Sequence, residues 1–178
     1  MKSITASLCI SLGVYALLNT HYSYLSMILF AFGLYMICTY EFDLFTGKCG
    51  YTIDAVSYKT ALRILAINLI VGYIIGYLFT NEAMVQYSQD VMAKWDWSLG
   101  YFIKSFFCGM IMFLAVETYK RGSLLGIFFG VPLFIICGFQ HCIANGIIMG
   151  AAHSFSWVIV LAIIGNWIGA IIINILRK

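Results

Sequence analysis

One histidine and two amide side chains interrupt an apolar run near the C-terminal end of the chain. The run is "FIICGFQHCIANGIIMG", from Phe134 to Gly150, and it contains Gln140, His141 and Asn145. Histidine has an unperturbed pKa of about 6.5, so small changes in its surroundings alter its charge near physiological pH. Ionisable groups inside apolar membrane segments are costly, and they usually mark a substrate path or a proton relay. The run therefore predicts a functional site built around His141.

A site of this kind suits the passage of small weak acids. A bare anion in a low-dielectric slit faces a desolvation penalty idealised at about 20 kcal/mol, and still several kcal/mol after relaxation. The neutral acid crosses far more cheaply, so a proton gained near the centre turns an excluded ion into a permeable molecule. His141 can donate that proton, or it can act as a neutral dipole, the form that burial favours. The sequence leaves both roles open.

The composition is that of an integral membrane protein. Of the 178 residues, 63% are hydrophobic and only 10% are charged, and the mean hydropathy is +0.97. This leaves too little polar surface to cover a soluble globule. A spanning helix needs about 20 apolar residues, so the chain has room for about six crossings. We expect a single transmembrane channel domain over residues 1–178, with no separate enzyme module.

The apolar segments and the charges between them predict the topology. Six apolar segments cover roughly residues 4–19, 24–40, 60–80, 98–118, 123–150 and 154–176, and the fifth is too long for one plain crossing. Basic residues cluster at every second boundary, whereas acidic residues dominate the long loop over 81–96. By the positive-inside rule, both termini are cytoplasmic. Trp95, Trp97 and Tyr101, beside the long loop, are typical of an interfacial aromatic belt.

Two polar breaks and two glycine pairs suggest an internal repeat. The breaks are "TYEFDLFTGKCGYTIDAVSYK", from Thr39 to Lys59, and "GFQHCIANG", and irregular backbone at membrane depth survives only beside protein or a water-filled cavity. Thr46 lies 26 residues before the first pair, Gly72 and Gly76, and His141 lies 24 before the second, Gly165 and Gly169. We therefore predict an all-α, 3+3 inverted repeat of six transmembrane helices, with halves at about 4–80 and 98–176. Its two broken helices would meet near the midplane, with Thr46 opposite His141.

Four motifs in this order resemble the formate/nitrite transporter family. They are "DLFTG" (43–47), "FLAVETYKRGS" (113–123), "GFQHCIANG" (138–146) and "IIGNWIGA" (163–170), and the similarity extends over about residues 6–173. The resemblance implies a homopentamer of aquaporin-like protomers in the lipid bilayer. Each protomer would have its own pore for small monovalent anions such as formate, nitrite or hydrosulfide.

The resemblance also implies roles for individual residues. The family's loop threonine, central histidine and motif asparagine fall on Thr46, His141 and Asn145. The family's cytoplasmic-side slit would be formed here by Leu34, Leu44 and Phe45. Its outer constriction would be formed by Phe30 and Phe134.

The outer mouth and the central site depart from the family pattern in places. Gln140 stands where the family has glutamate, and Gly109 stands where it has asparagine. An outer-vestibule lysine of the family falls near Lys94, and Lys104 lies about where the family has an arginine. Lysines at the outer mouth would concentrate anions before they enter. These departures bear on the substrate more than on the fold.

We therefore predict pH-dependent, proton-linked passage of small monovalent weak-acid anions across a bacterial cytoplasmic membrane. The alternative is a channel for neutral solutes such as urea, ammonia or water, which the neutral Gln140 would favour. Three separated histidines and scattered carboxylates offer no nucleophile or metal constellation, so we expect neither an enzyme, a cofactor nor a metal site. The partners predicted are the anion, a proton, the bilayer and copies of the same chain, without nucleic acid.

Overall fold

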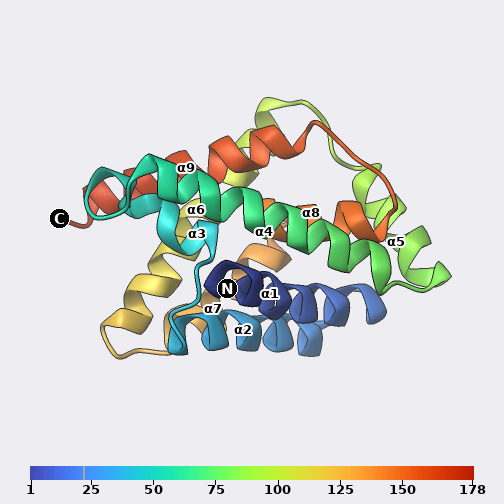
Figure 1. Ribbon diagram of the computed structural model, residues 1–178, viewed down its shortest axis with the longest axis horizontal. Coiled ribbons are helices and arrows are strands. Elements are labelled where there is room, and N and C mark those ends of the chain that lie inside the picture. Colours follow the sequence, from blue (N-terminus) through green and yellow to red (C-terminus); the bar gives the residue numbers. More distant parts are fainter. Residues whose placement is uncertain (22) are drawn as a thin grey trace.

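In a computed structural model, the described residues, 1–21 and 23–178, form helices joined by turns and loops, without a strand (Figure 1). The α-helices are α1 (Lys2–Asn19), α2 (Tyr24–Thr39), α3 (Phe45–Lys48), α4 (Tyr58–Leu78), α5 (Glu82–Met92), α6 (Leu99–Lys120), α7 (Leu125–Ile136), α8 (Cys142–Ala151) and α9 (Ile159–Leu176). A 3₁₀ turn, η1 (Cys49–Ile53), follows α3 directly. The prediction of an all-α chain is confirmed.

Four of the described helices are long and apolar enough to cross a membrane: α1, α4, α6 and α9. The helices α2, α7 and α8 are also apolar but shorter, with 16, 12 and 10 residues. The bounds of these seven apolar helices lie within a few residues of the predicted segments, except that α9 begins at Ile159 rather than near residue 154. The chain is therefore a multi-pass helical membrane protein with four candidate spans by length and composition.

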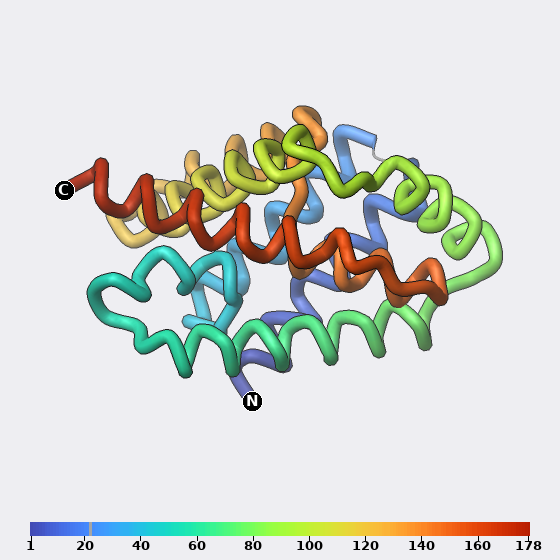
Figure 2. The backbone as a smooth tube through the Cα atoms, turned by 90° about the horizontal axis from the view of Figure 1, so that it is seen from above, coloured from blue at the N-terminus to red at the C-terminus, as the bar shows by residue number. Residues whose placement is uncertain are grey.

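The helices pack in pairs that lie far apart in the sequence. Helix α9 lies along α6, α8 lies on α4, and α1 packs against both α2 and α4 (Figure 1). The C-terminus and α5 lie at opposite ends of the molecule (Figure 2). A Cβ atom at Gly76 of α4 would overlap the carbonyl oxygen of Ile147 in α8, so this glycine lets two backbones touch. Small residues play this part commonly between membrane helices.

The two breaks fall where the sequence predicted them. The first separates α2 from α3, and Glu41 there has a positive φ of 53°. The second separates α7 from α8, and Gly138 has a φ of 65°, which costs glycine little because it has no Cβ atom. Each break runs from exposed to buried residues, from Glu41 to Leu44 in the first and from Gly138 to His141 in the second.

Two sequence expectations need correction at the end of the molecule that holds α5. The stretch over 81–96 is not one long loop, because residues 82–92 form α5. The Asn81 side chain caps this helix by accepting from the Met84 N–H at 2.9 Å, a start signal that the polar composition concealed. Tyr101 does not belong to an interfacial belt, because it is 4% exposed and its hydroxyl accepts a hydrogen bond inside the fold.

Candidate pore site

His141 ends the second break and caps helix α8 with its own ring. Its Nδ1 atom accepts a hydrogen bond from the Ala144 N–H at 3.1 Å, in the place where a serine or asparagine side chain usually caps a helix. An imidazole nitrogen that accepts a hydrogen bond carries no proton, so the ring in this arrangement is neutral with its proton on Nε2. His141 is 1% exposed, and its orientation is therefore fixed by the fold.

Thr46 meets this ring from the first break. Its Oγ1 atom lies 2.9 Å from His141 Nε2, although the two residues are 95 positions apart in the sequence. With Nε2 as the donor, the threonine oxygen accepts, and its own O–H remains to donate elsewhere. Thr46 is fully buried on the short helix α3. The structure thus joins the two breaks through one hydrogen bond between neutral side chains.

Gln140 and Asn145 form a second neutral cluster beside the ring. The Gln140 Nε2 atom donates to the Gly138 carbonyl at 2.9 Å, which fixes its Oε1 as the end that faces Asn145. Asn145 Nδ2 then donates to Gln140 Oε1 at 2.9 Å and to the Tyr101 hydroxyl at 2.8 Å. Both amide N–H groups of Asn145 are used, so its carbonyl oxygen is the end left to accept a hydrogen bond from elsewhere.

Two cavities lie on either side of the Thr46–His141 contact. The first, which we call the outer cavity, measures about 340 Å³ and is lined by Phe30, Lys94, Lys104, Phe134 and His141, with Gln140 and Asn145 among its other residues. Its described lining includes two lysines and no carboxylate. The structure therefore places both predicted outer-mouth lysines at one positively charged chamber.

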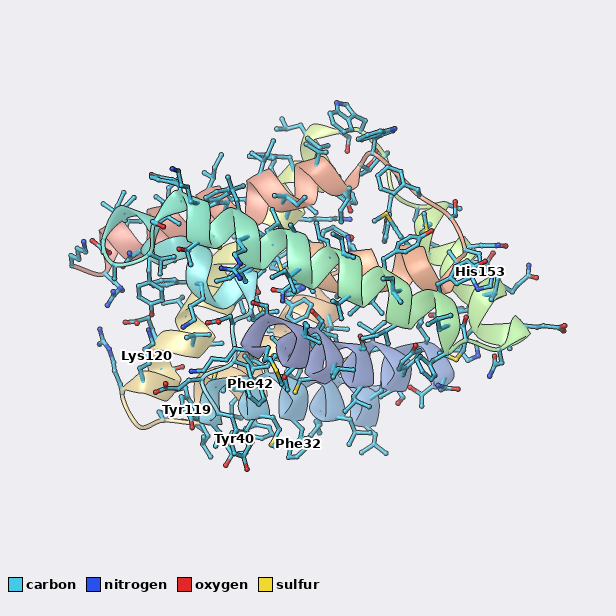
Figure 3. The ribbon with its side chains drawn as sticks, in the orientation of Figure 1. Phe32, Tyr40, Phe42, Tyr119, Lys120 and His153 are labelled. Atoms are coloured by element: carbon cyan, nitrogen blue, oxygen red, sulfur yellow. The ribbon has the colours of Figure 1, made fainter. Side chains whose placement is uncertain are left out.

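The second cavity, the inner cavity, measures about 470 Å³. Leu34 and Leu44 line it together with Glu41, Lys48 and Lys120. Tyr119, Lys120 and Phe42 gather at this end of the molecule, and His153 lies at the other end (Figure 3). The Lys120 ammonium also lies 3.8 Å above the centre of the Tyr51 ring, within the range of a cation–π contact.

A layer of apolar side chains closes the space between the two cavities. The rings of Phe30 and Phe134 meet edge to face at 5.8 Å, and Phe134 stacks on His141 at 5.8 Å. Below them, Phe45 is fully buried and its ring meets Trp167 at 5.4 Å. Phe30 and Leu34 are one helical turn apart on α2 and each is 0% exposed, yet they line different cavities. Of the predicted constriction residues, Phe30 and Phe134 line the outer cavity and Leu34 and Leu44 line the inner one, while Phe45 lines neither.

Hydrogen bonds and ion pairs join α6, α9 and the turn before α4 near the inner cavity. Arg177 and Tyr51 both donate to the carboxylate of Glu117, which is 8% exposed on α6. Beyond this, hydrogen bonds from Lys178 and then from Asn174 lower the pKa of Asp54, in the turn before α4. These contacts tie the segment that follows Thr46 to the ends of α6 and α9. In the part of the chain that the structure covers, no cluster of three histidine, cysteine or carboxylate side chains could hold a metal ion.

Two site residues escaped the sequence analysis, and they correct the predicted repeat. Asn68 of α4 accepts from the Phe45 N–H, and Asn166 of α9 accepts from the Cys142 N–H, each at 2.9 Å. These bonds make Phe45 of the first half equivalent to Cys142 of the second half. The residue equivalent to His141 is therefore Leu44 and not Thr46. The signal was a buried asparagine beside each glycine pair, in "INLIVGYIIG" and "IIGNWIGA", at nearly equal distances from the breaks.

Comparisons with known proteins agree with this architecture. No family model matches the chain. It is 31% identical over 171 residues to the uncharacterized transporter YrhG of Bacillus subtilis (strain 168), an alignment that covers 79% of this chain and 64% of that protein. The chain thus spans less than two thirds of the length of this curated relative.

A solved structure shares the fold over nearly the whole chain. It is an FNT family ion channel, with a TM-score of 0.67 and 20% sequence identity, and the match covers 99% of this chain and 85% of that one. The chain therefore has the fold of a membrane channel of the FNT, or formate/nitrite transporter, type. The resemblance seen in the four motifs is confirmed, and the relatives found are a transporter and an ion channel rather than enzymes.

The two cavities predict that side chains are accessible from opposite faces of the membrane. Val91 lines the outer cavity and Val116 the inner one, and both are partly buried. In a chain whose native cysteines are replaced by alanine, we expect a charged thiol reagent to modify Val91→Cys from one side only and Val116→Cys from the other. The measurement is labelling in sealed, oriented vesicles. Modification of both positions from the same side would contradict a closed layer between two chambers.

Proposed function

We propose that the chain mediates pH-dependent, proton-linked passage of small monovalent weak-acid anions, such as formate, nitrite or hydrosulfide, through a pore in each protomer. The observation that carries this proposal is the position of the Thr46–His141 contact in a closed apolar layer between two cavities that both contain lysines. An apolar layer rejects a bare ion, whereas lysine-lined chambers attract one. Only a species that is charged in the chambers and neutral in the layer satisfies both.

Each step of the passage has residues suited to it. Lys94 and Lys104 raise the anion concentration in the outer cavity, where no described carboxylate opposes them. At the edge of the apolar layer the anion takes a proton from water, and the neutral acid can donate its O–H to the carbonyl oxygen of Asn145, whose N–H groups are already bound. It then passes the layer beside Thr46 and His141, whose hydroxyl and ring are neutral hydrogen-bonding groups. The inner cavity holds Lys48 and Lys120 together with the Glu41 carboxylate, and there the acid releases its proton to water and regains its charge.

The geometry of His141 favours one of its two predicted roles. Its Nδ1 atom is occupied by the Ala144 N–H, so the ring in this arrangement acts as a neutral dipole rather than as an imidazolium. Donation of the Nε2 proton to a substrate would require Thr46 to turn away and the ring to recover a proton afterwards. We therefore assign His141 the role of an orienting hydrogen-bond donor to Thr46, whose hydroxyl faces the passing acid.

A channel for small neutral solutes remains the second candidate. Gln140, Asn145, Thr46 and His141 form a centre without a formal charge, and such a centre also admits urea, ammonia or water. The lysines of the two cavities distinguish the candidates, because a neutral solute gains little from them.

The proposal includes an arrangement in the membrane and an assembly. The first and second helix breaks are held by equivalent asparagine bonds, which supports six crossings in two inverted halves of a single domain. The cluster of Lys48, Lys120 and Arg177 at the inner end supports cytoplasmic termini in a bacterial cytoplasmic membrane. The homopentamer rests on the resemblance alone, and native mass spectrometry of the 20.0 kDa chain would refute it by giving another oligomer mass.

The pH dependence of flux tests the function directly. We expect purified protein in liposomes to pass formate, nitrite or hydrosulfide faster as the external pH falls, because the neutral fraction of each acid rises. His141→Ala should lower this flux by about tenfold or more, since it removes both the helix cap and the Thr46 partner. The matched control is His153→Ala, an exposed histidine near the outer end, which should leave flux unchanged. Urea flux that exceeds formate flux and ignores pH would favour the neutral-solute channel instead.

The outer lysines should act through charge rather than through structure. Both are exposed, so Lys94→Gln and Lys104→Gln should fold normally and lower the initial rate of anion uptake at low ionic strength. The difference from the wild type should shrink as salt is added, because salt screens exposed charges over about 10 Å at 0.1 M. Lys59→Gln, exposed on α4 and absent from the lining of either cavity, is the control. A loss that persists at high salt would show that these lysines do not work by attraction.

A further inference from the structure

The two buried asparagines make the same set of contacts in the two halves of the chain. In the second half, Asn166 Oδ1 accepts from the Cys142 N–H at 2.9 Å, the first amide after the break. Its Nδ2 donates to the Gln140 carbonyl at 2.8 Å, inside the break, and to the Ser105 carbonyl of α6 at 2.7 Å. One amide therefore binds the end of the break, the start of α8 and the first helix of its half.

Asn68 repeats this pattern in the first half. Its Oδ1 accepts from the Phe45 N–H, and its Nδ2 lies 2.8 Å from the Ser3 carbonyl of α1 and 3.2 Å from both the Asp43 carbonyl and the Ser7 hydroxyl. Both asparagines are 0% exposed. Only an amide offers an acceptor and two donors on one short, rigid group, so no other small side chain can satisfy all three backbone groups.

The first helix of each half is shaped to admit its asparagine. One turn after Ser105, Gly109 faces the Asn166 backbone, and a Cβ atom there would overlap the Asn166 carbonyl oxygen. One turn after Ser3, Ser7 occupies the matching place, and its hydroxyl lies 3.4 Å from the Asn68 carbonyl oxygen. The glycine that stands at 109 in place of the family's asparagine thus lets α9 approach α6 closely enough for Asn166 to reach the Ser105 carbonyl.

These contacts fix the residues that meet in the pore layer. His141 lies between Gln140 and Cys142, the two residues that Asn166 binds. Thr46 directly follows Phe45, whose amide Asn68 binds. An error at either break would shift one partner of the 2.9 Å Thr46–His141 contact. We propose that Asn68 and Asn166 are positioning residues, each closing its own helix break and together setting the Thr46–His141 contact.

Hydrogen exchange tests the closing role without any transport. In Asn166→Asp, one oxygen still accepts from Cys142, but the side chain has lost at least one of the two N–H donors that bind the Gln140 and Ser105 carbonyls. We expect the Cys142 amide to exchange about tenfold faster than in the wild type, and the Phe45 amide to stay protected. Asn68→Asp should give the reverse pattern. Asn19→Asp, at the exposed end of α1, is the control and should change neither amide.

A second pair of variants keeps the test decisive if an aspartate variant fails to assemble. Gly109→Ala should speed exchange of the Cys142 amide, because the added methyl group separates α9 from α6 at Asn166. Gly100→Ala on the same helix should not, since its Cβ atom would meet only the Ser98 side chain at 3.6 Å. The proposal is overturned if Cys142 keeps its wild-type exchange rate in either Asn166→Asp or Gly109→Ala.

The positioning role adds a flux measurement that rests on the proposed function. Asn166→Asp should lower flux relative to the wild type, whereas the control Asn19→Asp should not. Unchanged flux alongside faster exchange would show that Asn166 closes the break without setting the pore contact. Should the wild type pass no anion at all, the proposed function fails, and the exchange result still decides whether the asparagines hold the breaks.

Discussion

A backbone that leaves its helix inside a membrane must find new partners for every exposed N–H and C=O group, and this constraint shapes the whole molecule. Each unsatisfied group costs several kcal/mol in hydrocarbon. The chain meets the requirement twice, with Asn68 and Asn166 at the two breaks and with the His141 ring at the start of α8. The breaks bring Thr46 and His141 together, and the surrounding helices serve to bury these polar contacts.

The same arrangement determines where formal charges lie in the site. Formal charges lie in the two cavities, whereas the layer between them holds aromatic rings, leucines and neutral hydrogen-bonding groups. Gln140 continues this pattern, because an amide can bind both Gly138 and Asn145 without a charge. Under the proposed function, selection among substrates depends on how readily an anion takes up a proton to become the neutral acid, rather than on a tight binding site.

Much of this fold was visible in the sequence, because membrane segments follow directly from composition. Apolar runs gave the helices, and the polar stretches around Thr46 and His141 gave both breaks. The sequence failed where tertiary contacts decide. The polar composition of residues 81–96 gave no sign of helix α5. The position of Tyr101 beside the polar stretch suggested a membrane-surface residue, whereas its hydroxyl binds Asn145 inside the fold. The distances to the two glycine pairs align Thr46 with His141, but the asparagine hydrogen bonds align Phe45 with Cys142.

A measurement of the charge and hydrogen bonding of the His141 imidazole tests the neutral centre most directly. Solid-state ¹⁵N NMR of histidine-labelled protein in bilayers can report the protonation of both ring nitrogens, with a His141 variant used to assign the signal among the three histidines. At neutral pH we expect His141 to show a bare Nδ1 and a protonated Nε2, held in one orientation by Ala144 and Thr46. A ring protonated on both nitrogens would contradict a neutral centre and require that His141 meet the substrate as a cation.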